Sequence, residues 1–352
     1  MVQRKYDVLL YGSYGYTGKL IASECLNRKL SVLLCGRNED LLQLQSESIG
    51  YPFEVVAMHQ SDKLMNVLGQ CKLVIHCGGP FMLTARKMIE ACVATSTHYL
   101  DITGEYGVFQ LAHSYHQAAK DAGIMLMSGT GFDVVPTDCI SVYLKNQLPS
   151  ATNLQLAFAM RPSGVSRGTA KTAAMHLEAE TMIRHSGVLV SSGKFPKLVD
   201  IDFGAFKSKA IGISWGDIVT AFYSTGIPNI EVFVAADKKF IRNIFTSRRL
   251  SWLLSAKWVK KILMQIIDSS VSGPKSEHLI HGKCYVYGKV TDDNGNFREV
   301  RLEAPNGYRL TAQMAVHIAH KVLNGNFVAG YGTPAGVYGS ELILELGDVK
   351  RW

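Results

Sequence analysis

The first 130 residues alternate short apolar runs with longer stretches in which apolar side chains recur every three or four positions. This alternation is typical of strands followed by amphipathic helices, and repeated strand–helix units build a parallel sheet. We expect strands near 6–11, 31–35, 53–57, 72–76, 98–101 and 124–128, with helices that include 18–27, 39–47, 84–94 and 108–122. Six such strands predict one doubly wound α/β domain of the Rossmann type over residues 1–135.

The pattern changes after Pro136, where a helix near 137–147 precedes segments that alternate apolar and polar side chains. Strands near 283–291 and 297–303 are expected to form a hairpin, because the intervening Asn294-Gly295 supplies the positive φ of a tight turn. Further helices are expected near 169–186, 250–267 and 309–323. The length of 352 residues allows two domains, and we expect an α+β domain for substrate or dimer contacts over 136–308.

A glycine turn follows the first strand and opens the first helix, with Gly12, Gly15 and Gly18 in a G-x-x-G-x-x-G spacing. In such a turn the first glycine permits the sharp bend, the second lets backbone N–H groups approach a pyrophosphate, and the third lets helix and strand pack closely. The alternative is a plain tight turn without a ligand. The context favours a dinucleotide site formed by Gly12, Tyr14, Gly15, Tyr16, Thr17 and Gly18.

The end of the second strand, about 20 residues beyond the turn, distinguishes the two common nicotinamide cofactors. An NAD site carries a carboxylate there, which accepts a hydrogen bond from the ribose 2′-hydroxyl, whereas this chain has Arg37 followed by Asn38. A guanidinium suits a 2′-phosphate and accepts no hydrogen bond, so NADP(H) is predicted over NAD(H). A merely solvated arginine at a helix start is the alternative.

The later strands end in residues suited to the rest of an extended dinucleotide. Cys77, Gly78, Gly79 and Pro80 follow the fourth strand and are expected to line the cofactor, with Cys77 as a small packed residue rather than a nucleophile. Carboxylates follow the fifth and sixth strands, and we expect them to face the crevice between the domains: Asp101, Glu105, Asp133 and Asp138. For Asp133 and Asp138, helix capping is an equal alternative.

These motifs together resemble the saccharopine dehydrogenase-like oxidoreductases, in the branch that includes trans-acting enoyl reductases. The resemblance rests on Gly12 to Gly18, Gly36-Arg37, Gly79-Pro80-Phe81, Tyr99 to Glu105, Gly131-Phe132-Asp133 with Pro136 and Asp138, and Gly332-Thr333-Pro334-Ala335. It implies NADP-dependent reduction, and a substrate domain inserted before a C-terminal helix and tail, 309–352, that return to the Rossmann domain. It does not imply saccharopine as the substrate, because the glycine turn departs from the G-x-G-x-x-G of the lysine-pathway enzymes.

The leading hypothesis is therefore an NADP(H)-dependent enzyme that transfers hydride to a C=C or C=N bond of a small-molecule substrate, with lipid-like molecules among the candidates. A proton must also reach the product, and we expect Asp101, Glu105 or Tyr99 to supply it. A non-enzymatic NADP(H)-binding redox sensor is the alternative, although the large second domain argues against it. The helix start near Arg167 and Lys171 is a further candidate wall of the active site.

The net charge of +8 is concentrated in one segment, because eight basic residues and no acid lie between Lys238 and Lys261. No recognition-helix pattern supports nucleic-acid binding there. The region 250–267 reads as an amphipathic helix with more apolar surface than one core contact needs. On one face it has Trp252, Ala256, Val259, Ile262, Leu263, Ile266 and Ile267. Core packing or a homodimer interface would cover this surface, and peripheral membrane contact is the sharper alternative.

Seven cysteines without a Cys-x-x-Cys pair argue against a disulfide framework or a zinc site, and the sequence begins without a secretory signal pattern. We therefore expect a reducing, cytoplasmic setting. Three His-x-x-His pairs, which begin at His113, His278 and His317, have no carboxylate or cysteine at metal-ligand spacing. No metal site is predicted.

Overall fold

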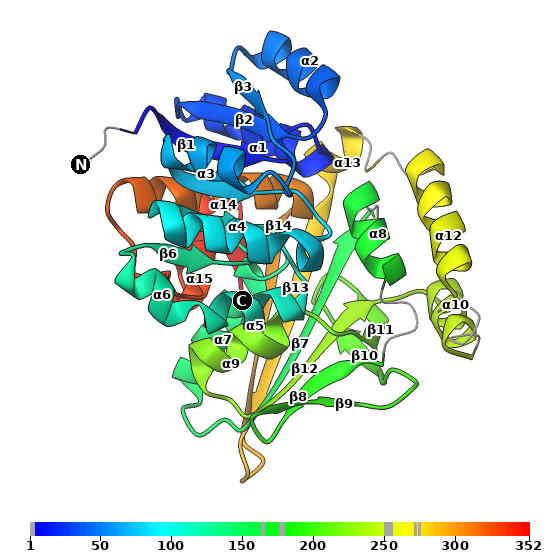
Figure 1. Cartoon of the computed structure of the whole chain (residues 1–352). Helices are drawn as coiled ribbons and strands as arrows, with labels where there is room; N and C mark the ends of the chain where they lie inside the picture. Colours follow the sequence, from blue (N-terminus) through cyan, green and yellow to red (C-terminus); the bar gives the residue numbers. More distant parts are fainter. Residues whose placement is uncertain (1–3, 163–165, 176–179, 250–255, 271–272, 274–275) are drawn as a thin grey trace. The chain divides into compact units, whose positions relative to one another are not determined.

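The computed structural model describes residues 4–162, 166–175, 180–249, 256–270, 273 and 276–352 (Figure 1). The chain divides into two compact units. The first unit comprises residues 1–135 and 307–346, and the second comprises residues 136–306 and 347–352. Each unit has its own sheet.

The described part of the first unit contains a seven-stranded sheet in the order β15-β6-β5-β4-β1-β2-β3. Every neighbouring pair is parallel. Because β1 lies between β2 and β4, the strand order reverses there, and open α/β sheets bind ligands at the carboxyl end of such a switch point. The strands are β1 (Tyr6–Tyr11), β2 (Val32–Gly36), β3 (Phe53–Val55), β4 (Cys71–His76), β5 (His98–Asp101), β6 (Met125–Met127) and β15 (Gly330–Tyr331).

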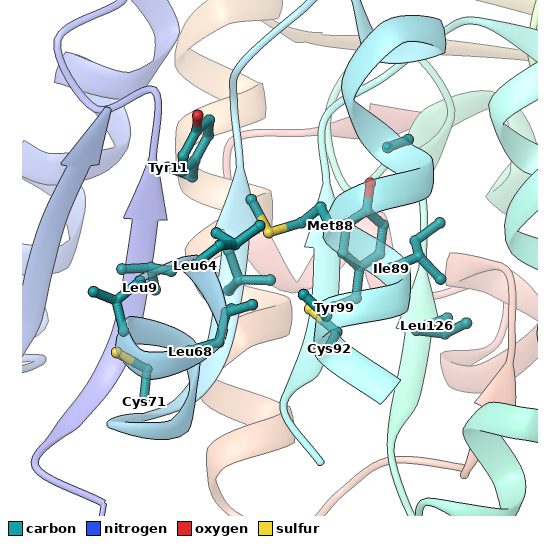
Figure 2. Close-up of a cluster of buried hydrophobic side chains, with 14 of the residues drawn as sticks. Leu9, Tyr11, Leu64, Leu68, Cys71, Met88, Ile89, Cys92, Tyr99 and Leu126 are labelled. Atoms are coloured by element: carbon teal, nitrogen blue, oxygen red, sulfur yellow. The ribbon is translucent and has the colours of Figure 1, made fainter. Parts of the chain in front are cut away.

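Helices cover this sheet because its strands are almost entirely apolar and need both faces buried. Helices α3 and α4 pack against each other, and α14 packs against α1, β4 and β5. Figure 2 shows Tyr99 of β5 beside Met88, Ile89 and Cys92 of α4, within the buried cluster that also includes Leu9 and Leu64. The helical elements are α1 (Tyr16–Asn27), α2 (Glu39–Ile49), α3 (Ser61–Gly69), α4 (Phe81–Thr95), α5 (Tyr106–Ser114), α6 (His116–Asp121), α14 (Gly307–Leu323), α15 (Pro334–Tyr338) and the 3₁₀ helix η1 (Leu342–Leu346).

The second unit contains a mixed sheet with the main order β10-β11-β12-β7-β13-β14-β16, and β8 pairs with β12 and β9. Strands β12 and β7 are parallel, and the other pairs are antiparallel. Its strands are β7 (Asn153–Arg161), β8 (Met182–His185), β9 (Val188–Ser191), β10 (Leu198–Asp202), β11 (Lys207–Gly212), β12 (Asn229–Ala235), β13 (Lys283–Thr291), β14 (Phe297–Pro305) and β16 (Lys350–Arg351).

The predicted hairpin is present as β13 and β14, and Gly295 adopts a φ of +81° at its turn. Asp292 holds the turn, because its Oδ1 accepts hydrogen bonds from the backbone N–H groups of Asn294 and Asn296. The helices linked with this unit are α7 (Val135–Gln147), α8 (Arg167–Met175), α9 (Asp217–Thr225), α10 (Lys238–Arg249), α12 (Lys257–Ser270) and α13 (Ser276–His281).

Three expectations are corrected. The helix expected over 169–186 is α8 only as far as Met175, and Met182–His185 is a strand because β8 pairs with β9 and β12. Residues 250–255 of the helix expected at 250–267 lie outside the described residues, and α12 continues to Ser270. Of the C-terminal segment, residues 307–346 belong to the first unit, and only residues 347–352 belong to the second, where β16 pairs with β14.

The predicted α/β class with a Rossmann-type parallel sheet is confirmed. Its six predicted strands are present within two residues at each end, and β15 is a seventh. No helix in the described ranges combines the length and apolar composition needed to cross a membrane.

Candidate cofactor and active site

The glycine turn connects β1 to α1 at the switch point of the sheet. Gly12 adopts a φ of +80°, which side-chain-bearing residues rarely adopt, and its N–H donates to the carbonyl of Cys35 at 2.7 Å. A Cβ atom on Gly18 would lie 2.4 Å from the oxygen of Gly12 and 2.6 Å from that of Ser13. The backbone therefore packs too closely in this turn for a side chain at either position.

The turn also fits the phosphates of a dinucleotide. Helix α1 begins at Tyr16, directly after Gly15, and the first-turn N–H groups of a helix lack intrahelical partners. Together with the helix dipole, they attract an anion. The hydroxyl of Ser13 is buried and has no hydrogen-bond partner among the described residues. An unsatisfied buried donor beside a helix N-terminus is consistent with a ligand oxygen nearby.

Tyr14 connects the glycine turn with the end of β2. Its hydroxyl accepts a hydrogen bond of 3.3 Å from the backbone N–H of Arg37, and its ring lies so close to Gly36 that a Cβ there would be 2.4 Å away. The side chain of Arg37 is exposed, and so it is accessible to a 2′-phosphate. Asn38 instead caps helix α2, because its Oδ1 accepts from the N–H of Leu41 at 2.9 Å. For Asn38 this geometry favours capping over cofactor contact.

The segment from His76 to Pro80 leads from β4 into α4. The N–H of Cys77 donates to the carbonyl of Tyr11, which holds the segment against β1, and a Cβ on Gly12 would meet the backbone of Cys77 and Gly78 at 2.9–3.0 Å. The glycine turn and this segment are thus in contact, as expected for two walls of one dinucleotide site. Burial raises the pKa of the Cys77 thiol, which keeps the sulfur protonated and argues against a nucleophile.

His76 and Thr84 hold the Cys77–Pro80 segment through hydrogen bonds. The imidazole is fully buried, and its Nε2 lies 2.9 Å from the hydroxyl of Thr84, which itself donates to the carbonyl of Gly78 at 2.9 Å. Burial lowers the pKa of His76 to about 3, so the ring is neutral at physiological pH. Both residues thus hold the Cys77–Pro80 segment in its conformation.

Tyr99 and Asp101, predicted as proton donors, are fully buried at the end of β5. The Tyr99 hydroxyl donates to Asp101 Oδ2 at 2.7 Å, and Asp101 Oδ1 accepts from the N–H groups of Thr103 and Gly129 at 3.0 and 2.8 Å. Burial raises the pKa of both side chains. Because these bonds link the ends of β5 and β6, the geometry favours a structural role for the pair over direct proton transfer to a substrate.

Glu105, the third predicted proton donor, is bound to the start of helix α4. Its two carboxylate oxygens accept from the backbone N–H groups of Phe81 and Met82, at 3.0 and 2.9 Å. These are the first two residues of α4, whose preceding Pro80 has no side chain that could cap it. A carboxylate is favourable at a helix N-terminus. Glu105 thereby holds the Gly79-Pro80 segment in place from a neighbouring strand end.

Asp133 is a further carboxyl group at this edge of the sheet, and its pKa is raised. It follows β6, is partly exposed, and lies in the electrostatic field of Asp101 and Glu105. Burial and these two carboxylates raise its pKa to about 7. By contrast, Asp138 belongs to the second unit, where it is buried on α7 and accepts a hydrogen bond from Ser224 of α9. Asp133 and Asp138, for which the sequence predicted the same two alternatives, therefore have different environments.

The turn before Asp133 is closely packed against α14. Gly129 has a φ of +72°, and the N–H of Phe132 donates to the hydroxyl of Thr311 on α14 at 3.0 Å. A Cβ on Gly131 would lie 2.5 Å from Thr311. The sequence motif singled out the Gly131-Phe132-Asp133 turn, but the raised pKa of Asp133 depends on carboxylates from another strand end. His76, Thr84 and Ser13 were missed because nothing in their local pattern distinguishes them from core residues.

The remaining candidate sites are weaker. At the start of α8, Ser166 Oγ accepts from the N–H of Thr169 at 3.2 Å, which is ordinary helix capping. His113 and His116 stack on each other, with ring centroids 6.3 Å apart. Within the described ranges, no three His, Cys, Asp or Glu side chains are grouped so that they could hold a metal ion.

Comparison with known proteins agrees with this geometry. Residues 8–127 match the family model of the saccharopine dehydrogenase NADP binding domain. A mouse saccharopine dehydrogenase-like oxidoreductase is 26% identical over 166 residues, which are 42% of this chain and 39% of that protein. A Mycobacterium tuberculosis protein named as a trans-acting enoyl reductase is 31% identical over 149 residues, 40% of this chain and 35% of that protein. The matched region is thus well under half the length of these curated relatives.

The fold of the whole chain resembles that of a solved structure. The apo saccharopine dehydrogenase (L-Glu forming) from Saccharomyces cerevisiae superposes with a TM-score of 0.65 over 99% of both chains, at 11% identity. At that identity the similarity concerns the fold alone. The family match confirms the predicted cofactor, NADP(H), and the predicted resemblance. Residues 8–127 therefore match the saccharopine dehydrogenase NADP binding domain family, and the chain is similar to the saccharopine dehydrogenase-like oxidoreductases.

Proposed function

We propose that the protein is an NADPH-dependent reductase that delivers hydride to a C=C or C=N bond, with enoyl thioesters as the first substrate class to test. The observation that carries this proposal is the close-packed glycine turn at the switch point, with the exposed Arg37 at the end of the neighbouring strand. The name of the mycobacterial relative supports the choice of enoyl substrates. When bound, the reduced nicotinamide supplies the hydride.

Three parts of the first unit would bind the cofactor. The N–H groups at the start of α1 bind the pyrophosphate, and the Arg37 guanidinium binds the 2′-phosphate. The Cys77–Pro80 segment, fixed by Glu105 and Thr84, forms the wall next to the nicotinamide half. Each side chain here binds or positions the cofactor.

Asp133 is the residue that we propose as the proton donor. A reduction by hydride needs one proton from a general acid, and a general acid works best when its pKa is near the working pH. The pKa of Asp133 is raised to about 7, so a substantial fraction carries the proton at neutral pH. Tyr99 and Asp101 are fully buried, and both Glu105 oxygens accept hydrogen bonds from α4.

Cofactor preference is tested by titrating NADPH and NADH into the wild type and the Arg37→Glu variant. We expect the charge reversal to weaken NADPH binding about 100-fold, because it removes a charge-assisted contact and adds repulsion, and to leave NADH nearly unchanged. Arg298→Glu, an exposed arginine of β14, is the matched control and should change neither affinity. If Arg37→Glu leaves the ratio of the two affinities unchanged, the 2′-phosphate assignment is wrong.

Activity is tested by following NADPH oxidation with enoyl thioesters, cyclic imines and keto acids. Turnover with enoyl thioesters or imines supports the proposal. Tight NADPH binding without turnover on any of them would contradict it and favour the redox sensor. For a turned-over substrate, kcat should fall as the pH rises through about 7, where Asp133 loses its proton.

The Asp133→Asn variant isolates the proton-transfer step. It should lower kcat about 100-fold or more, abolish the decline above pH 7, and bind NADPH as tightly as the wild type. Asp121→Asn, at the exposed end of α6, is the control for loss of one carboxylate. A variant with normal kcat and an unchanged pH profile would remove Asp133 from the mechanism without affecting the cofactor assignment.

A further inference from the structure

The helix α12 exposes an apolar line that the proposed reaction does not use. Trp258, Ile262 and Ile266 are 63%, 47% and 53% exposed, and their spacing of four places them along one face. The polar Gln265 and Ser269 are exposed on the same side. Solvated globular proteins rarely leave a tryptophan and two isoleucines in a row on one helix without a partner.

The exposed apolar face of α12 is not the face that packs within the second unit. The inner side of α12 carries Val259, Leu263 and Ile267, of which Ile267 is 8% exposed, and α12 contacts α8. The helix is therefore apolar on two sides. Sequence periodicity grouped Ile262 and Ile266 with the inner residues, and the structure separates them. Packing within the second unit accounts for the inner side, which leaves the outer side for another occupant.

The helix α10 precedes α12 along the chain (Figure 1). It provides positive charge. Lys238, Lys239, Arg242 and Arg249 are exposed there, together with Phe240, which is 46% exposed. Between Lys238 and Lys261 the sequence contains eight basic residues and no acidic one, which equals the net charge of the whole chain. An apolar line preceded by such a basic helix has the chemistry of a surface that meets an anionic, partly apolar partner.

We propose that α10 and α12 dock the protein on an anionic lipid surface, with Trp258, Ile262 and Ile266 inserted among the acyl chains. Tryptophan is favoured at the boundary between headgroups and hydrocarbon, and basic side chains are attracted to anionic lipid. A second copy of this chain fits less well, because a symmetric contact would bring two sets of the same cations together. Nucleic acid would use the cations and leave the apolar line uncovered.

The experiment is co-sedimentation of the full chain with phosphatidylcholine vesicles that contain about 30% phosphatidylserine, and with vesicles of phosphatidylcholine alone. We expect binding to the anionic vesicles at low salt, at least about tenfold weaker binding to the neutral ones, and strong weakening at about 0.5 M salt. Tryptophan fluorescence should shift to the blue on binding, and this shift should be lost in Trp258→Ser.

Matched variants separate the two components of the surface. Trp258→Ser and Ile262→Ser should each weaken vesicle binding on the order of tenfold, whereas Val328→Ser, an equally exposed apolar residue of the first unit, should not. Lys238→Glu with Lys239→Glu should also weaken binding, whereas Lys87→Glu with Lys120→Glu, the same charge change on α4 and α6, should have little effect. All the substituted side chains are exposed, so every variant should keep the NADPH affinity and the Tm of the wild type, and these two measurements control for folding.

The proposal is overturned if the wild type fails to bind anionic vesicles at low salt, or if the α12 variants bind as well as the wild type. Binding of a DNA or RNA duplex that competes fully with vesicles and is insensitive to Trp258→Ser would identify nucleic acid as the partner. Conversion of a dimer to a monomer by Trp258→Ser, without vesicle binding, would identify a second copy. Each of these outcomes is independent of the NADPH and turnover measurements.

Discussion

Replacing Gly18 with Ala tests whether the glycine turn is as closely packed as the structure indicates. The new Cβ would lie 2.4 Å from the oxygen of Gly12, whereas such contacts essentially never fall below 3.0 Å, and both neighbours are backbone atoms that cannot rotate away. The turn would have to open by at least about 0.6 Å. Overpacking of this kind costs about 1–3 kcal/mol, offset by about 1 kcal/mol because alanine favours the helix.

The matched control is Gly69→Ala, at the end of helix α3. No atom lies within 4 Å of a Cβ built there, so the change should be neutral or should stabilise the protein by up to about 1 kcal/mol. The two variants make the same chemical change, Gly18→Ala near the start of helix α1 and Gly69→Ala at the end of helix α3. Only the packing around the added methyl group differs.

Thermal unfolding and NADPH titration are the two assays. Gly18→Ala should lower Tm by a few degrees relative to Gly69→Ala. It should weaken NADPH binding about tenfold or more, because the N–H groups that face the pyrophosphate move by a large fraction of an ångström. If Gly18→Ala is as stable as Gly69→Ala and binds NADPH with wild-type affinity, the close packing and the phosphate site inferred from it are both wrong.

Three further predictions concern hydrogen-bonding side chains of the first unit. Tyr99→Phe removes the hydrogen bond that the Tyr99 hydroxyl donates to Asp101 Oδ2. It should lower the free energy of unfolding, measured by urea titration, by about 1–3 kcal/mol and leave kcat nearly unchanged. A large loss of kcat at normal stability would instead support the catalytic role expected from the sequence. Arg4→Ala removes donors to the carbonyls of Cys71, Thr95 and Ser96, and should lower the urea midpoint more than Arg298→Ala. Neutral His76 contributes stability above pH 6.5 that is lost as the pH falls toward 3, because the unfolded chain binds the proton more tightly. His76→Gln should therefore flatten the decline of the urea midpoint between pH 6.5 and 4. An unchanged slope would contradict the lowered pKa of His76.

Much of the first unit follows from local pattern. Apolar runs of four to six residues, separated by amphipathic helices, predicted its first six strands because a parallel sheet buries both faces of every strand. The position of the glycine turn was predicted correctly, since its glycines lie within seven positions of one another between a strand and a helix. The hairpin of β13 and β14 followed for the same reason, from Asn294-Gly295.

Elements whose stability comes from distant partners were not predictable in this way. Strand β15 has two residues, and it exists because it pairs with β6. Strand β8 interrupts an expected helix because β9 and β12 offer it hydrogen bonds. Short segments with weak periodicity adopt the structure that their neighbours stabilise, and those neighbours are brought close only by the fold.

The roles of the acidic side chains divide along the same line. The sequence by itself placed Tyr99, Asp101, Glu105 and Asp133 at the carboxyl ends of adjacent strands, because strand ends can be counted along the chain. Only the tertiary structure decided that Asp101 is bonded to Tyr99, that Glu105 holds helix α4, and that Asp133 has a pKa of about 7. Hydrogen bonds and electrostatic interactions depend on distances of a few ångströms between residues far apart in sequence, and those distances are set by the packing of the whole sheet.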